Sequence, residues 1–273
     1  MDALPTTIML TGATSGLGRA VAQQLATREN TRLILHGRSR DRLHELADAL
    51  DDAPADVVLV TADLGDLQQV NQLAEDVAAV TDHLDVLVHN AGVGKGATDT
   101  REVSADGYEL RLAVNHLAPF VLTQRLLPLL EIGAPSRIVN VASGAQQPID
   151  FSDPQIQQDY SGNRAYAQSK FAMVAFGFAL SKTLLAEVVT VNSLHPATLM
   201  PTRMVKEGYG RTVDDLQTGV DAVLNLIENP ALDGTTGQYF SIQQPAAAHP
   251  ETYDVETQRR LWQLSEELTG VRY

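Results

Sequence analysis

Short apolar runs rich in β-branched residues alternate with segments of helical periodicity along nearly the whole chain. Such an alternation predicts a parallel sheet with helices on both faces, joined by right-handed crossovers. Most of the runs are continuously apolar, as expected for strands that are covered on both sides. The sequence therefore predicts an α/β fold with a doubly wound, seven-stranded parallel sheet. The expected strands are Ile8–Gly12, Leu33–Gly37, Val57–Ala62, Val86–Asn90, Ile138–Ala142, Val188–Ser193 and Gln238–Ile242.

Helical spacing of apolar residues is clearest in Arg40–Leu50 and Leu67–Val80. No linker, low-complexity segment or short-period repeat interrupts the 273 residues, so a single domain is expected over residues 1–273. Residues 245–273 form a C-terminal extension in which Leu261 to Leu268 predicts an amphipathic helix.

The charge balance and the absence of cysteine exclude several functions. With 34 acidic and 20 basic residues, the chain has a net charge of −14 and lacks the basic face that nucleic-acid binding requires. Without cysteine it has no disulfide, thiolate nucleophile or zinc–thiolate site. Met1 to Thr7 lacks the layout of a secretory signal, and no window of about 20 residues is apolar enough to span a membrane. We expect a cytoplasmic protein with no membrane span and no nucleic-acid partner.

Two long connections interrupt the alternation, Gln146–Arg164 and Met200–Asp215. Both follow expected strands on the carboxyl side, the edge where open α/β sheets bind ligands. Long connections in compact domains are often functional. We therefore expect these two segments to form the walls of a substrate site.

A glycine-rich turn, Thr11–Gly18, joins the first expected strand to the first expected helix. Glycines allow a tight turn and a close approach of backbone to ligand, and the helix N-terminus offers free N–H groups and a positive dipole end to a pyrophosphate. This placement predicts a Rossmann-type dinucleotide site. The turn residues expected at the cofactor are Gly12, Thr14, Ser15, Gly16, Leu17 and Gly18.

The spacing T-G-x-x-x-G-x-G resembles that of the short-chain dehydrogenase/reductases, and the resemblance extends over nearly the whole chain. The segment Pro148-Ile149-Asp150-Phe151 and the C-terminal helix are similar to the retinol-dehydrogenase-like subgroup. His89 and Ala197 replace the Asn and Gly that are usual in the family. The other matching residues are Asp63-Leu64, Asn90-Ala91-Gly92, Asn115, Ser143, Tyr166-Ala167-Gln168-Ser169-Lys170 and His195-Pro196-Ala197.

This resemblance implies a role for each match. Tyr166 would be the general acid or base, Ser143 would hold the substrate oxygen, and Asn115 would order a water leading from Lys170 to solvent. Hydride would pass between the nicotinamide and a carbonyl carbon. The residues implied at the cofactor are Asp63, Leu64, Asn90, Ala91, Gly92, Tyr166, Lys170, Pro196 and Thr198.

Tyr166 and Lys170 lie four residues apart, so on a helix they share one face. Lowering a tyrosine pKa from about 10 to near 7 takes about 4 kcal/mol. A cation about 4 Å away at an effective dielectric of 20 supplies that order of energy. A histidine-based mechanism is less favoured, because His195 precedes a proline in an apolar loop and is expected to be structural. No histidine forms a metal-ligand pattern with carboxylates, so no metal is expected.

The end of the second strand indicates which cofactor is preferred. An acidic residue there would bind the ribose 2′-hydroxyl of NAD, whereas an arginine accommodates the 2′-phosphate of NADP. The chain has Gly37-Arg38-Ser39 and no acid before Asp41. We therefore expect Arg38 to bind the phosphate and NADP(H) to be preferred over NAD(H).

Three functions remain open on sequence grounds. The favoured one is an NADP(H)-dependent oxidoreductase acting on a carbonyl or alcohol. The alternatives are a non-catalytic NADP(H)-binding sensor or scaffold, and an enzyme that reduces an activated C=C bond. A homo-oligomer is left open, since no pattern demands one. The two long connections offer mostly apolar side chains, which favour an apolar or bulky small-molecule substrate: Pro148, Ile149, Phe151, Leu199, Met200, Met204, Val205 and Tyr209.

Overall fold

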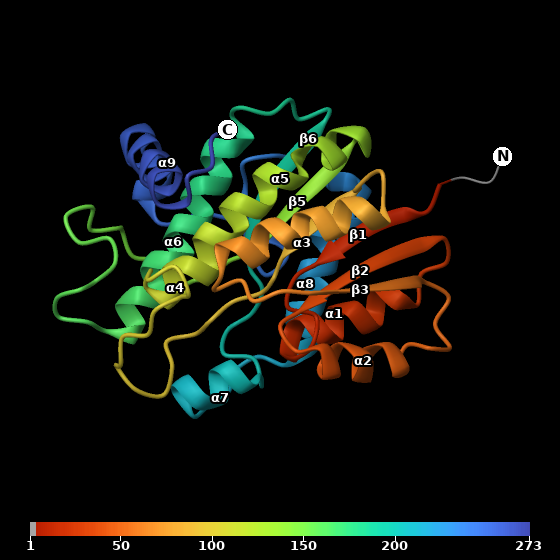
Figure 1. Cartoon of the computed structure of the whole chain (residues 1–273), viewed down its shortest axis with the longest axis horizontal. Helices are drawn as coiled ribbons and strands as arrows, with labels where there is room; N and C mark the ends of the chain where they lie inside the picture. The colour runs from red at the N-terminus through yellow and green to blue at the C-terminus, as the bar shows by residue number, and fades with distance from the viewer. Residues whose placement is uncertain (1–3) are drawn as a thin grey trace.

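A computed structural model describes residues 4–273 and contains one eight-stranded sheet (Figure 1). The strand order is β3-β2-β1-β4-β5-β6-β7-β8, with β1 to β7 parallel and β8 antiparallel to β7. The doubly wound, seven-stranded parallel sheet is thus confirmed. The strands are β1 (Thr6–Leu10), β2 (Thr31–Gly37), β3 (Asp56–Thr61), β4 (Val86–His89), β5 (Ser136–Val141), β6 (Val189–His195), β7 (Tyr239–Ser241) and β8 (Gln244–Ala246).

The eighth strand was not predicted. It is three residues long and contains Pro245, which cannot donate a hydrogen bond to a neighbouring strand. Proline is tolerated at a sheet edge, where its missing N–H would face solvent. A strand of three residues carries no periodic signal.

Helices cover both faces of the sheet (Figure 1). On one face α1 and α2 pack against β2 and α8 packs against β5 and β6, while α3, α5 and α6 pack on the other face. The helices are α1 (Gly16–Ala26), α2 (Arg40–Asp48), α3 (Leu67–Val80), α4 (Leu110–Leu112), α5 (Ala118–Ile132), α6 (Gly162–Ser181), α7 (Arg203–Tyr209), α8 (Leu216–Glu228) and α9 (Val255–Thr269), with a π-helical turn at Ala113–Leu117 and 3₁₀ turns at Pro230–Leu232 and Pro250–Tyr253.

The two long connections differ in structure. Met200–Asp215 contains the short helix α7, whereas the first connection ends where α6 begins at Gly162. Both leave the sheet at its carboxyl edge. The order of the strands reverses between β1 and β4, which is the switch point where ligands of such sheets bind.

The C-terminal extension covers α5 and α6 through α9, the amphipathic helix expected from the sequence. The Trp262 and Tyr273 rings lie 4.7 Å apart, centroid to centroid, and both pack on Phe120. His116, buried in the π-helical turn, has Nε2 2.7 Å from Oγ of Ser265. Within residues 4–273 no helix is long and apolar enough to cross a membrane. The cytoplasmic location stays a prediction.

Candidate active site

The glycine-rich turn has a backbone that favours glycine. Gly12 and Gly16 have φ values of +70° and +54°, in the left-handed region where a side chain is strained. A Cβ at Gly18 would lie 2.2 Å from the carbonyl oxygen of Gly12. The Ser15 side chain makes no capping hydrogen bond at the start of α1. The first-turn N–H groups can therefore face a phosphate at the positive end of the helix.

Two side chains from neighbouring strands hold this turn. The N–H of Gly12 donates to Nδ1 of His36 (3.3 Å), and Nε2 of His36 lies 3.1 Å from the carbonyl oxygen of Ala62. Burial lowers the pKa of His36 to about 4, so the ring is neutral, with its proton on Nε2. Asn90 donates through Nδ2 to the carbonyl oxygens of Thr11 and Gly12 (2.8 and 3.2 Å). Sequence reasoning assigned His36 no role, although a histidine inside an apolar strand signals a buried polar contact.

Arg38 lies just beyond β2 and is largely solvated. Its side chain is 76% exposed, and Nη1 lies 3.8 Å from Oδ2 of Asp63. Ser39 accepts a hydrogen bond from the N–H of Arg42 and caps α2. The structure thus brings Arg38 and Asp63, both expected at the cofactor, to the same rim of the site.

Other residues expected at the cofactor lie near the turn or in the core. Leu17 and Leu64 are buried in the two hydrophobic cores, so their side chains serve packing. Ala91 approaches the turn closely, since a Cβ at Gly12 would lie 2.8 Å from its Cα. Thr14 packs over the end of β2, where a Cβ at Gly37 would lie 2.4 Å from its Cγ2.

Pro196 and Thr198 follow β6 at the carboxyl edge. Pro196 is buried and Thr198 is exposed. The Thr198 hydroxyl lies 3.2 Å from Nε2 of His195, and its N–H donates to Asp214 (2.6 Å). Burial lowers the pKa of His195, which suits a neutral ring that supports the loop.

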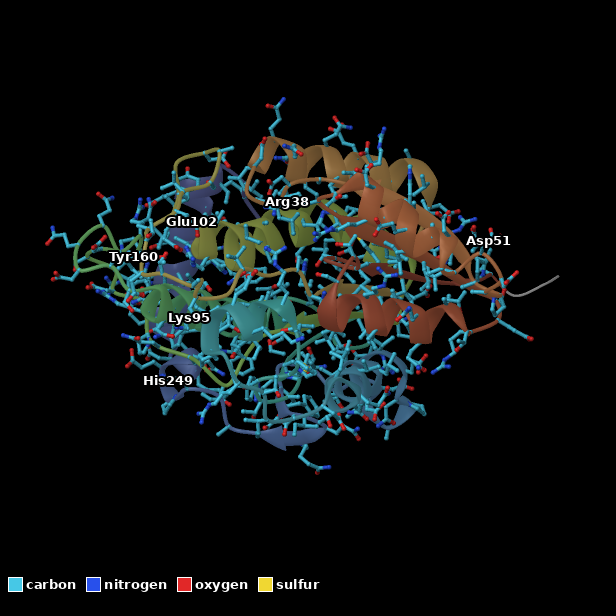
Figure 2. All side chains as sticks on the ribbon, turned by 90° about the horizontal axis from the view of Figure 1, so that it is seen from below. Arg38, Asp51, Lys95, Glu102, Tyr160 and His249 are labelled. Atoms are coloured by element: carbon cyan, nitrogen blue, oxygen red, sulfur yellow. The ribbon has the colours of Figure 1, made fainter. Side chains whose placement is uncertain are left out.

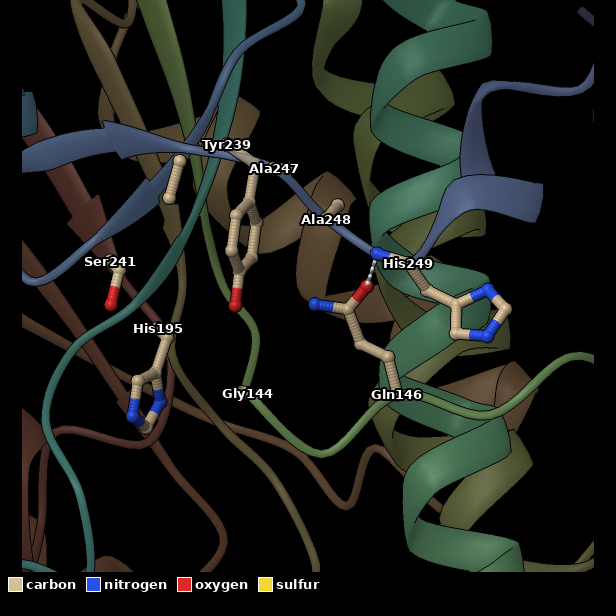
Figure 3. A pocket seen from close by; sticks show the side chains of 9 residues that line it. Gly144, Gln146, His195, Tyr239, Ser241, Ala247, Ala248 and His249 are labelled. Atoms are coloured by element: carbon tan, nitrogen blue, oxygen red, sulfur yellow. Dashed lines mark hydrogen bonds between the residues drawn. The ribbon is translucent and has the colours of Figure 1, made fainter.

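Ser143 lies two residues beyond β5 and is fixed from both sides. Its hydroxyl oxygen accepts a hydrogen bond from the N–H of Ala145 (3.1 Å), which leaves the O–H to donate elsewhere. Its carbonyl oxygen accepts from the Tyr239 hydroxyl (2.9 Å) and from Nε2 of Gln146 (3.0 Å). Gln146 in turn accepts from the N–H of His249 (2.9 Å), as Figure 3 shows. Sequence reasoning missed Gln146 and Tyr239, because a partner in a distant strand leaves no local pattern.

Tyr166 and Lys170 lie on α6 near the end of β5. Tyr166 is half-buried, and this burial raises the pKa of its phenol, while a hydrogen bond with Ser143 opposes the shift. Lys170 is buried and donates from Nζ to the carbonyl oxygen of Val141 (2.8 Å). Burial lowers the pKa of Lys170 to about 8. The structure does not show the expected lowering of the Tyr166 pKa by Lys170, because the ammonium donates to the backbone instead.

Asn115 is fully buried in the π-helical turn, a local irregularity that is common at functional sites. Its Oδ1 accepts from the N–H of Val93 (2.7 Å), and its Nδ2 donates to the carbonyl oxygen of Val93 (3.0 Å) and to Oγ of Ser169 (2.8 Å). The Ser169 hydroxyl donates to the carbonyl oxygen of Tyr166 (2.8 Å). A Cβ at Gly92 would lie 3.2 Å from Oδ1 of Asn115 and 3.5 Å from Nζ of Lys170. Asn115 and Lys170 thus lie beside Gly92, and Asn115 is linked to the backbone of Tyr166 through Ser169.

A buried arginine holds the loop that follows β4. The Arg111 side chain is 1% exposed and donates to the carbonyl oxygens of Gly94 (3.0 Å) and Lys95 (3.2 Å). It also pairs with Glu102 (3.1 Å) and Glu109 (3.4 Å).

The Tyr160 hydroxyl donates to Glu109 (3.0 Å), which ties the loop before α6 to the same arginine. Glu102, Tyr160 and Lys95 lie at one end of the molecule, away from Asp51 (Figure 2). Sequence reasoning missed this network. The one feature that could have indicated it is the arginine inside the otherwise apolar run Leu110–Val114, because a charged side chain in such a run needs buried partners.

The apolar residues of the two long connections divide into two groups. Ile149 and Phe151 pack with Phe171 and Leu261, and Met200 joins the core on the other face, so these three serve packing. In α7, by contrast, Met204 and Tyr209 are 37% and 41% exposed.

Helix α7 lies over the loop that follows β4. A Cβ at Gly94 would lie 2.5 Å from Cγ of Met204, and Nζ of Lys95 lies 5.3 Å from the centroid of the Tyr209 ring. Helix α7 therefore forms the apolar side of the site. No group of three or more His, Asp or Glu side chains within residues 4–273 could hold a metal ion.

Comparison with known proteins gives concordant matches. The family model described as short chain dehydrogenase matches residues 6–210. Retinol dehydrogenase 14 of Mus musculus is 32% identical over 297 residues, covering 97% of this chain and 86% of that protein.

Two solved structures agree in fold. An uncharacterized protein from Mycobacterium paratuberculosis has a TM-score of 0.78 and 27% identity, covering 99% of this chain and 97% of that one. A protein described as a short chain dehydrogenase from Escherichia coli CFT073, complexed with NADPH, has a TM-score of 0.67 and 26% identity, covering 88% of this chain and 98% of that one.

Proposed function

Because the chain belongs to the short chain dehydrogenase family of oxidoreductases, we propose that it interconverts a carbonyl compound and an alcohol with NADP(H). The observation that carries this proposal is the hydrogen bond between the side chains of Ser143 and Tyr166, with Lys170 four residues further along α6 and its Nζ beside Gly92. The Escherichia coli relative complexed with NADPH supports the choice of cofactor.

The residues of the turn fit a dinucleotide. Side chains at Gly12 and Gly18 would collide with Ala91 and with the Gly12 carbonyl oxygen, so glycine keeps the turn tight and its N–H groups accessible to a pyrophosphate. Arg38 would bind the 2′-phosphate, because its guanidinium is exposed beside Asp63 and no carboxylate precedes it on β2. When bound, the nicotinamide cofactor supplies or accepts the hydride. The other residues proposed to hold it are Thr14, Ser15, Leu17, Leu64, Asn90, Ala91, Gly92, Tyr166, Lys170, Pro196 and Thr198.

Tyr166 acts as the general acid in carbonyl reduction. Its raised pKa keeps the phenol protonated at neutral pH, so it can donate a proton to the substrate oxygen. The Ser143 O–H donates to the same oxygen, because the N–H of Ala145 already occupies a lone pair of the hydroxyl. In alcohol oxidation Tyr166 would have to accept a proton, which its raised pKa disfavours at neutral pH. Reduction therefore starts from the protonated phenol.

Lys170 returns a proton to Tyr166 through a water that Asn115 orders. Nζ of Lys170 and Oδ1 of Asn115 both lie close to Gly92, which has no side chain to separate them from that water. Asn115 also positions Tyr166 through Ser169. Tyr239 and Gln146 are positioning residues as well, since they act on Ser143 through its carbonyl oxygen.

The substrate is a bulky alcohol or carbonyl compound with an apolar body. The exposed side chains of Met204 and Tyr209 on α7 support this assignment, as does the similarity to retinol dehydrogenases. A non-catalytic sensor would have no need of a serine hydroxyl fixed as a donor. Reduction of a C=C bond is distinguished by its product.

The test is NADPH oxidation, followed at 340 nm, with a panel of aldehydes, ketones and activated alkenes. Tyr166→Phe should lower turnover by about 10²–10⁴-fold and leave the Kd for NADPH within a few-fold. Tyr108→Phe is the matched control, because its phenol donates to the distant carbonyl oxygen of Leu268. Wild-type turnover in Tyr166→Phe would refute the mechanism, and NADPH binding without any turnover would favour the sensor.

A further inference from the structure

A hollow of about 370 Å³ opens beside Ser143, within the size range of small-ligand sites. It is bounded by the turn after β5, the end of β6 and the segment that follows β7 (Figure 3). Gly144 follows Ser143 directly, and the Tyr239 hydroxyl donates to the Ser143 carbonyl oxygen. The hollow therefore adjoins the proposed reaction site. Its lining consists of Gly144, Gln146, His195, Tyr239, Ser241 and residues 246–249.

The lining is polar but carries no carboxylate, ammonium or guanidinium group. Gly144 and the alanines at 246, 247 and 248 leave it wide. A phosphate or carboxylate would find no cation here, and burial lowers the pKa of His195 and so favours its neutral ring. A hydrogen-bonding group without charge suits this lining better than an ion does.

Some of these polar groups are engaged within the protein, but two are not. Tyr239 and Gln146 bond to Ser143, and Gln146 also bonds to His249. By contrast, the Ser241 hydroxyl and Nδ1 of His195 make no hydrogen bond to any group within residues 4–273. Figure 3 shows both side chains on the same side of the hollow. A hydrocarbon tail placed here would cover both polar groups and leave them without partners, which is unfavourable.

We propose that this hollow is a substrate subsite for a neutral hydrogen-bonding group, such as a hydroxyl or a second carbonyl, that Ser241 and His195 hold. This inference rests on the proposed reductase function and narrows its substrate class. The favoured substrate is an oxygenated carbonyl compound with an apolar body against α7 and a second polar group in the hollow. Ser241 and His195 are then specificity-determining residues.

The experiment compares matched ketones that differ only in the second oxygen. The pairs are 2-hexanone with 2,5-hexanedione, and 4-phenyl-2-butanone with 4-(4-hydroxyphenyl)-2-butanone, which place that oxygen at two distances from the reacting carbonyl. In the wild type, kcat/KM for NADPH-dependent reduction should favour the oxygenated member of at least one pair by about tenfold, the effect of one to two hydrogen bonds. Ser241→Ala should bring that ratio close to one, while Ser241→Thr, which keeps the hydroxyl, should retain it. Ser181→Ala, in which the lost hydroxyl donates to the carbonyl oxygen of Phe178, is the control and should keep the wild-type ratio.

Equal kcat/KM within both pairs would overturn the subsite while leaving the reductase function intact. So would a preference that survives both Ser241→Ala and His195→Phe. If no ketone is reduced, the proposed function fails instead, and ligand-observed NMR on the NADP-loaded protein decides the subsite. Contact with 4-(4-hydroxyphenyl)-2-butanone in the wild type that is lost in Ser241→Ala would support it, and no difference between the two would overturn it.

Discussion

Removing the Tyr239 hydroxyl tests whether the backbone of Ser143 must be held from outside its own loop. In Tyr239→Phe the ring stays in place, because Tyr239 is 4% exposed and packs with Met173, Val174 and Phe178. The Ser143 carbonyl oxygen keeps the bond from Gln146 (3.0 Å) and loses the one from Tyr239 (2.9 Å). A hydrogen bond of this kind contributes about 0.5–1.5 kcal/mol. If that energy serves to align the Ser143 O–H with the substrate, kcat/KM for reduction should fall roughly 2- to 12-fold.

Tyr273→Phe is the matched control, because it also removes one phenol hydroxyl that donates to a backbone carbonyl oxygen. In this case the acceptor is the carbonyl oxygen of Phe120 (2.7 Å). Both variants should lose similar free energy of unfolding in urea, but only Tyr239→Phe should lose reductase activity. Burial raises the pKa of Tyr239 to about 12, so its hydroxyl is a donor throughout the assay range. Unchanged kcat/KM in Tyr239→Phe, or an equal loss in Tyr273→Phe, would refute the reasoning.

Three further predictions concern charge. Arg38→Leu should raise the Kd for NADPH about tenfold and leave the Kd for NADH nearly unchanged; the effect is modest because solvent screens the exposed guanidinium. Equal losses of affinity for both cofactors in fluorescence titrations would contradict the phosphate contact. Because the pKa of Tyr166 is raised, the rate of carbonyl reduction should persist through neutral pH and decline as alkaline pH ionises the phenol, while the rate of alcohol oxidation should rise. Opposite trends in the two pH–rate profiles would argue against Tyr166 as the acid. Burial lowers the pKa of His36 to about 4 and those of His89 and His116 to about 3, so the unfolded chain takes up protons before the folded one as pH falls below about 6.5. Urea titrations should therefore show that the free energy of unfolding falls by about 2 kcal/mol per histidine by about pH 5. A free energy of unfolding that stays constant from neutral pH to about pH 5 would show that these rings are hydrated.

The sequence was sufficient wherever the signal is local. The strands were predictable because a strand covered on both faces must be apolar throughout, as in Ile138–Ala142, which overlaps β5. The glycine-rich turn was predictable because its backbone shape requires particular residues within eight positions. Tyr166 and Lys170 could be placed together because they lie four residues apart on one helix.

Contacts between distant segments could not be predicted in the same way. Arg111 donates to carbonyl oxygens 16 and 17 residues earlier, and nothing in its neighbours specifies those partners. The direction of the Tyr166 pKa shift depends on how deeply the phenol is buried and on where Nζ of Lys170 points, and both follow from packing. Residue types can indicate a reaction, whereas the protonation of each group depends on the three-dimensional arrangement of its neighbours.

The hydrogen bonds that hold Ser143 also determine at which point during synthesis of the chain this site can form. Tyr239 follows Ser143 by 96 positions, and His249 follows Gln146 by 103. A ribosome releases the glycine-rich turn and the first four parallel strands long before it releases either of these later residues. A growing chain could thus form its cofactor cradle while the serine loop still lacks its outer support. An mRNA truncated before the codon for Tyr239 would accordingly encode a fragment that, at most, binds the nucleotide. Reductase activity would begin only near the end of translation.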